Sequence, residues 1–248
     1  MKSFKQVVFW FLMIWVQNAL GQRTEISVSV NSGFFYYAGS FPVSSTFINS
    51  YGSTNGYTNN PYGKKLGFSY GISSNIERIT TGRWIYGLDL GYERLRSRVL
   101  LNEVFSGFFM NNSNPVNNST PVSGKTNLGY GFINVFPFLG HRFNHRKFSW
   151  DLKVGSDLAL PISGNEQGKA TSQNGTVFTV SRAGIGVFDI RPRMELSLKI
   201  HKLGFYAGYS YGLINYTKGL VGGGPYTTYS RYIRLGASYT LDKLKLVK

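Results

Sequence analysis

The chain has 248 residues, no cysteine, and a formal net charge of +16 from 27 Lys and Arg against 11 Asp and Glu. Without cysteine it is not a small secreted domain held by disulfides, and the positive excess raises the question of a polyanionic partner. The 17 Tyr, 19 Phe and 30 Gly are typical of strands in a β-barrel.

The first 21 residues have the layout of a secretory signal peptide. Lys2 and Lys5 precede an apolar run at 7–16, and small residues follow it. The run is shorter than the roughly 20 residues that a membrane-spanning helix needs. We therefore expect cleavage after residue 21 and a mature chain from Gln22. Export also argues against nucleic acid as the polyanion.

Eight segments place apolar side chains at every second position. This period of two predicts β-strands with one apolar face and one small or charged face. The segments are approximately 25–37, 64–77, 84–93, 127–143, 147–160, 177–200, 203–213 and 231–241. The sixth needs a bulge near Gly184 or Gly186.

Short and long connections alternate between these segments. TTGR, NHRK and His201-Lys202 are short, whereas the polar connections 38–63, 96–126, 161–176 and 215–230 are long. This predicts an all-β fold, an eight-stranded antiparallel transmembrane β-barrel of meander topology over residues 22–248, with its short turns and both termini in the periplasm.

The apolar run at residues 99–110 leaves three alternatives. It extends a hairpin above the membrane, contacts a partner, or adds a strand pair that makes ten strands.

In such a barrel the apolar faces meet lipid and the other faces line the lumen. For 127–143 this assigns Leu128, Tyr130, Phe132, Phe136 and Phe138 to the lipid, on a face that Asn134 interrupts.

The charged residues of the opposite faces are expected inside, together with Glu25. Unpaired ions in a narrow lumen are costly, so they should form an ion-pair network that plugs it. An ion path, a proton path or a gate is the alternative. The residues are Glu77, Asp89, Glu93, Asp151, Lys153, Asp157, Asp189, Arg191, Arg193, Glu195, Lys199 and Arg234.

Five further bases point outward near the expected extracellular rim: Lys64, Arg94, Arg96, Arg98 and Arg231. The phosphates of lipopolysaccharide are suitable partners for arginine in charge-assisted hydrogen bonds. Cations that snorkel at a membrane interface are the alternative with equal weight.

Residues 234–241, RLGASYTL, follow the pattern polar-x-Gly-x-x-aromatic-x-hydrophobic. This resembles the C-terminal signal that the barrel-assembly machinery reads, although here the tail DKLKLVK follows it. The whole mature chain resembles small outer-membrane β-barrel proteins of the OmpA/OmpX type, and in particular the outer-membrane β-barrel domain family that includes PorT-like proteins. The resemblance implies a bacterial outer-membrane location.

No catalytic, cofactor or metal site is expected. The three histidines, His141, His145 and His201, lack the spacing of a triad or a paired-His motif. The leading hypothesis is a non-enzymatic integral outer-membrane protein whose polar loops contact the envelope surface or a protein partner. PorT-like membership would imply a secretion or assembly accessory, and a lipid-modifying enzyme with a site assembled from several strands stays open.

Overall fold

A computed structural model describes residues 23–111, 114–184, 186–219 and 224–245; the predicted signal peptide lies outside them. Within these residues no helix is long and apolar enough to cross a membrane. The described residues form eleven strands: β1 (Arg23–Ala38), β2 (Ser45–Asn49), β3 (Asn55–Thr58), β4 (Lys65–Ile79), β5 (Trp84–Asn111), β6 (Asn114–Asn144), β7 (Ser149–Ser172), β8 (Val177–Gly184), β9 (Asp189–Ile200), β10 (Leu203–Tyr211) and β11 (Tyr229–Lys245).

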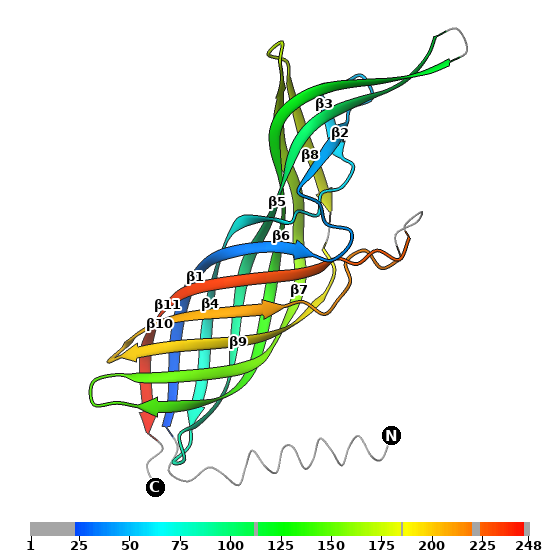
Figure 1. Ribbon diagram of the computed structural model, residues 1–248. Helices are drawn as coiled ribbons and strands as arrows, with labels where there is room; N and C mark the ends of the chain where they lie inside the picture. The colour runs from blue at the N-terminus through cyan, green and yellow to red at the C-terminus, as the bar shows by residue number, and fades with distance from the viewer. Residues whose placement is uncertain (1–22, 112–113, 185, 220–223, 246–248) are drawn as a thin grey trace, which may run out of the picture.

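Eight of the strands pair antiparallel in a closed ring, here called the lower ring (Figure 1). Their order is β1, β4, β5, β6, β7, β9, β10 and β11, which is also their order in the chain. The last strand returns to the first, from Arg23↔Lys245 to Ala38↔Tyr229. A closed sheet has no free edge, so its backbone groups find partners on both sides.

Three of these strands continue past the lower ring and close a second, smaller ring. The upper parts of β5, β6 and β7 join β2, β3 and β8 in this upper ring (Figure 1). Two of its contacts are parallel, β2 with β5 and β3 with β8. Its buried core consists of Ile48, Leu101, Val104, Ala170 and Val180.

The long connections are therefore more ordered than their polar composition suggests. Most of 96–126 and 161–176 is strand, and 38–63 contributes β2 and β3. Neither eight nor ten strands describes the whole sheet, because eleven strands form two rings that share β5, β6 and β7. The apolar run at 99–110 belongs to the β5–β6 hairpin, which continues to the pair Asn111↔Asn114 (Figure 1).

The sixth predicted segment is two strands rather than one strand with a bulge. β8 pairs with the upper part of β7, from Gly164 to Thr171, whereas β9 pairs with its lower part, from Ser149 to Ala159. The chain leaves the upper ring at Gly184 and enters the lower ring at Asp189.

The alternation along the lower-ring strands separates an apolar outside from a polar inside. On β4 the side chains of Phe68, Ile72 and Ile76 are exposed, whereas Asn75 and Glu77 are buried. The same division holds on β7, where Val154, Leu158 and Leu160 are exposed opposite buried Asp151 and Asp157.

The predicted orientation of β6 is wrong. Leu128, Tyr130, Phe132, Phe136 and Phe138 are buried and point into the ring, whereas the side chains at odd positions, such as Leu139, are exposed.

Glycines on the neighbouring strands explain why the aromatic side chains of β6 fit inside the lower ring. A Cβ at Gly87 would lie 2.6 Å from Cζ of Phe138, and one at Gly155 would lie 2.9 Å from Cε2 of Phe136. The space that the missing side chains leave is occupied by the aromatic rings of β6.

Candidate functional site

The interior of the lower ring is filled by three groups of side chains. An aromatic cap lies toward the upper ring and consists of Phe35, Tyr37, Leu95, Leu128, Tyr130, Phe132, Ala159, Tyr216 and Tyr232. Below it lies an upper charge cluster of Asp89, Glu93, Asp157, Arg191, Arg193, Glu195 and Arg234. A lower charge cluster consists of Glu25, Glu77, Arg142, Asp151, Lys153 and Lys199.

Arg142 is the centre of the lower charge cluster. It makes a forked pair of hydrogen bonds to Asp151, each of 2.7 Å. It also donates to Glu77 at 2.9 Å and to both carboxylate oxygens of Glu25 at 3.2 Å. Lys153 and Lys199 bring the buried members to three bases against three acids, and the partly exposed Arg23 lies 2.6 Å from Glu25 at the edge of the cluster. The cluster is thus charge-balanced and hydrogen-bonded, the condition under which buried ions are tolerated.

Asp157 is the corresponding centre of the upper charge cluster. Its carboxylate lies 3.0 Å from Arg234, 3.3 Å from Arg193 and 3.8 Å from Arg191. Ser210 donates a further hydrogen bond of 2.9 Å. Both Arg191 and Arg234 have no exposed surface.

Aromatic faces cover the guanidinium groups where hydrogen bonds do not. Cζ of Arg193 lies 4.1 Å from the centre of the Phe136 ring, and Cζ of Arg191 lies 5.2 Å from that of Phe132. Such contacts attract the cation to the π face. The inward rings of β6 therefore belong to the same packed interior as the ions.

Eleven of the twelve residues predicted for the lumen make ion pairs in these two clusters. Asp189 stands apart: it accepts hydrogen bonds from Tyr216 at 3.0 Å and Ser230 at 2.5 Å, beside the aromatic cap. Beside Asp89 and Arg193 the remaining space is about 10 Å³, which is room for about one water molecule.

Arg142 is the functional residue that sequence reasoning missed. The sequence-based prediction places the even-numbered residues of β6 on the lipid face, whereas the structure has them inside. The signal was present, since Asn134, Gly140 and Arg142 share one face and Ile133 and Leu139 the other.

The five bases predicted at the outer rim differ in how exposed they are. Lys64 is exposed, and Arg94, Arg96 and Arg98 are partly exposed on the outer face of β5. Arg231 is buried under Tyr211, with Cζ 3.4 Å from the ring centre, and donates to the Ser230 carbonyl at 2.7 Å.

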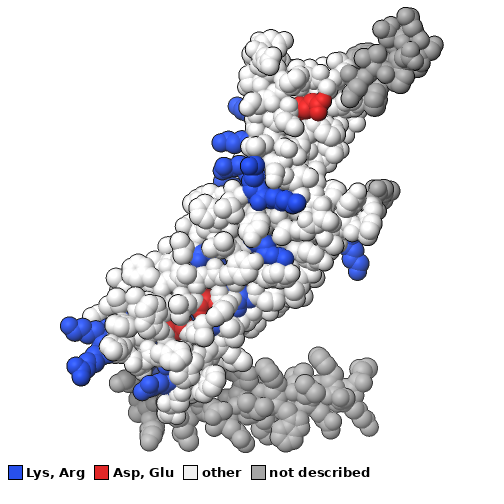
Figure 2. Space-filling model, in the orientation of Figure 1, with Lys and Arg blue, Asp and Glu red and all other residues white. Residues whose placement is uncertain are grey.

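Neighbouring strands extend this basic surface. Lys65 is exposed and is paired in register with Arg98. Lys125 and Lys169 are also exposed and are paired with each other. Figure 2 shows basic side chains gathered where the two rings meet. The acids whose burial the structure describes, by contrast, are buried or line the lumen except for Glu103. The outer surface is therefore strongly cationic, although the interior is nearly neutral.

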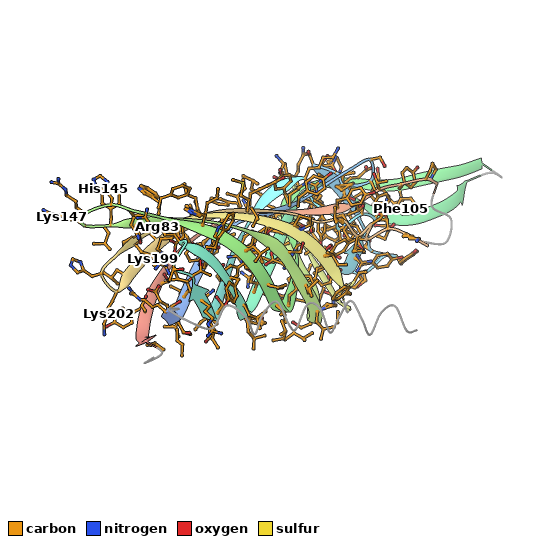
Figure 3. The ribbon with its side chains drawn as sticks, turned by 90° about the horizontal axis from the view of Figure 1, so that it is seen from below. Arg83, Phe105, His145, Lys147, Lys199 and Lys202 are labelled. Atoms are coloured by element: carbon orange, nitrogen blue, oxygen red, sulfur yellow. The ribbon has the colours of Figure 1, made fainter. Side chains whose placement is uncertain are left out.

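A second basic region lies at the short turns. Arg83, His145, Lys147 and Lys202 lie at the end of the molecule opposite Phe105 (Figure 3). The exposed rings of Trp84, Phe143 and Trp150 lie on the outer face just inside these turns.

Among the described residues no group of three or more His, Cys, Asp or Glu is placed to hold a metal ion.

No family model and no curated protein matches the chain. Solved structures that it resembles include Neisserial surface protein A, with 11% identity, a TM-score of 0.39, and coverage of 87% of this chain and 97% of the other. Another is Ail, the attachment invasion locus protein of Yersinia pestis, in complex with the heparin analogue sucrose octasulfate, with 13% identity, a TM-score of 0.34, and coverage of 90% and 100%. The translocator domain of the autotransporter NalP from Neisseria meningitidis has 12% identity, a TM-score of 0.21, and coverage of 96% and 95%.

Proposed function

We propose that the chain is an integral protein of the bacterial outer membrane. Its lower ring is an eight-stranded transmembrane barrel, and its upper ring stands outside the cell. The observation that carries this proposal is the reversal of polarity: buried arginines and carboxylates inside, and exposed apolar side chains on the outer face of the ring. In water this arrangement would be unfavourable, whereas in lipid it satisfies both faces.

Aromatic and basic residues at the two ends support this placement. Tyr70, Tyr209 and Tyr211 are exposed toward the upper ring, and Trp84 and Trp150 toward the short turns. Aromatic side chains of this kind favour the two membrane interfaces. The short turns then face the periplasm, as do residues 23 and 245, which pair at that end.

The protein acts by binding rather than by transport or catalysis. The two charge clusters and the aromatic cap plug the barrel, and the upper ring and its long hairpin present a surface for an envelope component or protein partner. Assembly uses the barrel-assembly machinery, which would read residues 234–241.

The plug predicts an electrically silent protein. Reconstituted in a planar bilayer, the full chain should give no large and stable conductance, because eight strands leave an interior that side chains fill. Insertion is verified separately, by protease protection of lipid vesicles that contain the same protein. Steady porin-like steps would contradict the plug and favour an ion path.

The basic rim binds the phosphates of lipopolysaccharide. Arg94, Arg96 and Arg98 lie at successive outward positions of β5, directly above the apolar outer face. Arginine matches phosphate in forked hydrogen bonds. Replacing all three by Gln should lower co-purifying lipopolysaccharide and the thermal stabilisation that added lipopolysaccharide gives.

The matched control removes three bases at the opposite end, Arg146, Lys147 and Lys202, by the same change to Gln. That variant should keep the bound lipopolysaccharide, because this lipid occupies the outer leaflet alone. If the rim variant also keeps the lipid and its stabilisation, the arginines are interfacial cations that snorkel rather than a phosphate site.

A further inference from the structure

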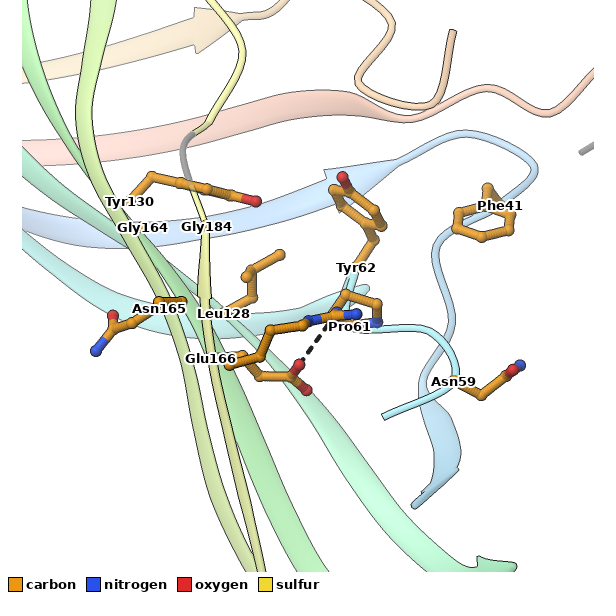
Figure 4. A pocket seen from close by; sticks show the side chains of 12 residues that line it. Phe41, Asn59, Pro61, Tyr62, Leu128, Tyr130, Gly164, Asn165, Glu166 and Gly184 are labelled. Atoms are coloured by element: carbon orange, nitrogen blue, oxygen red, sulfur yellow. Dashed lines mark ion pairs between the residues drawn. The ribbon is translucent and has the colours of Figure 1, made fainter. Parts of the chain in front are cut away.

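A cavity of about 310 Å³ opens where the lower and upper rings meet (Figure 4). Its walls come from β6, from β7 and β8 at the start of the upper ring, and from the segments that flank β2 and β3. Small-molecule sites typically have about 300–1,000 Å³, so this cavity suits a single ring-sized ligand. It lies above the plugged lumen.

One wall of the cavity is aromatic. Tyr62 and Tyr130 line it, and the ring centre of each lies 6.5 Å from that of Tyr216. The ring centre of Phe41 lies 6.0 Å from that of Tyr62. Such rings offer a flat apolar surface with a polar edge, which suits a ligand with one apolar face.

The other wall holds a fixed cation. Arg182 of β8 pairs with Glu166 of β7 at 3.1 Å, and its side chain is 43% exposed. Glu166 is buried, and it also accepts hydrogen bonds from Thr58 and, at 3.3 Å, from Thr126. Burial raises the pKa of Glu166, and these donors oppose that shift. The carboxylate is thus occupied within the protein, whereas Arg182 keeps guanidinium N–H groups for a ligand.

One amide completes the set of polar groups. Asn59 lines the cavity with donor and acceptor capacity. The amide of Asn165 points away from the cavity (Figure 4), and its side-chain oxygen accepts a hydrogen bond from Arg94 on the outer face. The cavity therefore combines an aromatic wall, one amide and one available cation.

We propose that this cavity binds one uronic acid unit, a sugar ring that carries a carboxylate. The apolar face of the sugar ring packs on Tyr62 and Tyr130, one of its hydroxyls bonds Asn59, and its carboxylate takes a charge-assisted hydrogen bond from Arg182. The cationic outer surface around the cavity attracts such anions. This site goes beyond the proposed membrane placement and does not depend on it.

The test is ligand-detected NMR titration of the full chain in detergent with D-glucuronate, using D-glucose as the neutral probe. R182Q removes the cation and should weaken glucuronate about tenfold or more, as loss of a charge-assisted hydrogen bond does. K218Q, which removes an exposed base that does not line the cavity, should leave binding unchanged.

A steric variant keeps the ion pair intact and covers the case in which R182Q does not fold. A Cβ added at Gly184, which lines the cavity, meets no atom within 4 Å, so G184L should fold and should abolish binding. The proposal is overturned if the wild type binds no glucuronate, if glucose binds as well, if K218Q weakens binding as much as R182Q, or if G184L still binds.

Discussion

Replacing Arg142 with methionine should destabilise the lower ring by about 3–5 kcal/mol, the usual cost of removing one partner from a buried ionic cluster. Methionine keeps much of the volume but leaves Glu77 and Asp151 to Lys153 and Lys199, and Glu25 to Lys199 and the partly exposed Arg23. Urea unfolding in lipid vesicles measures this through the fluorescence of Trp84 and Trp150, both on the lower ring.

The control is R146M, which removes an exposed arginine of the same hairpin. Its effect should stay within about 0.5 kcal/mol, as for most surface substitutions. Adding D151N to R142M removes one uncompensated carboxylate and should recover part of the stability that R142M loses. A stability of R142M equal to that of R146M would contradict a charge-balanced interior.

Replacing Ile48 with aspartate should open the upper ring and leave the lower ring folded. Ile48 is fully buried between Leu101, Val104 and Val180. Loss of its packing together with burial of an unpaired carboxylate should cost about 4 kcal/mol or more. The core of the upper ring is small, so a loss of this size should be larger than the stability of that ring.

Limited proteolysis on intact cells measures the effect. In the wild type, cleavage within 96–126 should be confined to the outer part of the hairpin, beyond the last β2 pairing at Asn49↔Phe105. In I48D, sites at 99–105 should become accessible, while TTGR and NHRK stay protected. T54D, an exposed change in the same connection, should resemble the wild type. Unchanged protection of 99–105 in I48D would contradict a closed upper ring.

Much of the lower ring could be predicted from sequence because its strands alternate with a strict period of two. On β4 and on the lower part of β7, up to Leu160, this pattern assigns the side chains to the correct faces. The rule failed on β6, where both faces are apolar and hydrophobicity alone does not distinguish lipid from lumen. There the orientation is indicated by Asn134 and Arg142 on one face of β6 and by glycines on other strands, which make room for Phe136 and Phe138.

The upper ring and its cavity were beyond such reasoning for a different physical reason. β2 and β3 are short and are embedded in Ser, Asn and Gly, which resemble a loop locally. They become strands because β5 and β8 offer them parallel partners distant in the chain. The Glu166–Arg182 pair likewise depends on the register of β7 and β8. The alternation within one segment predicts neither the parallel pairings of β2 and β3 nor the register between β7 and β8.

The measurement that tests the central claim most directly uses spin labels, one at a time, on the outer face of the lower ring. The chain has no cysteine, so single cysteines at Phe68, Ile72 and Ile76 label cleanly. In lipid vesicles these labels should be accessible to oxygen and shielded from a water-soluble nickel complex, whereas a label at Tyr57 in the upper ring should show the reverse. Equal access of the nickel complex at Ile72 and Tyr57 would mean that the ring faces water, which would contradict a transmembrane barrel.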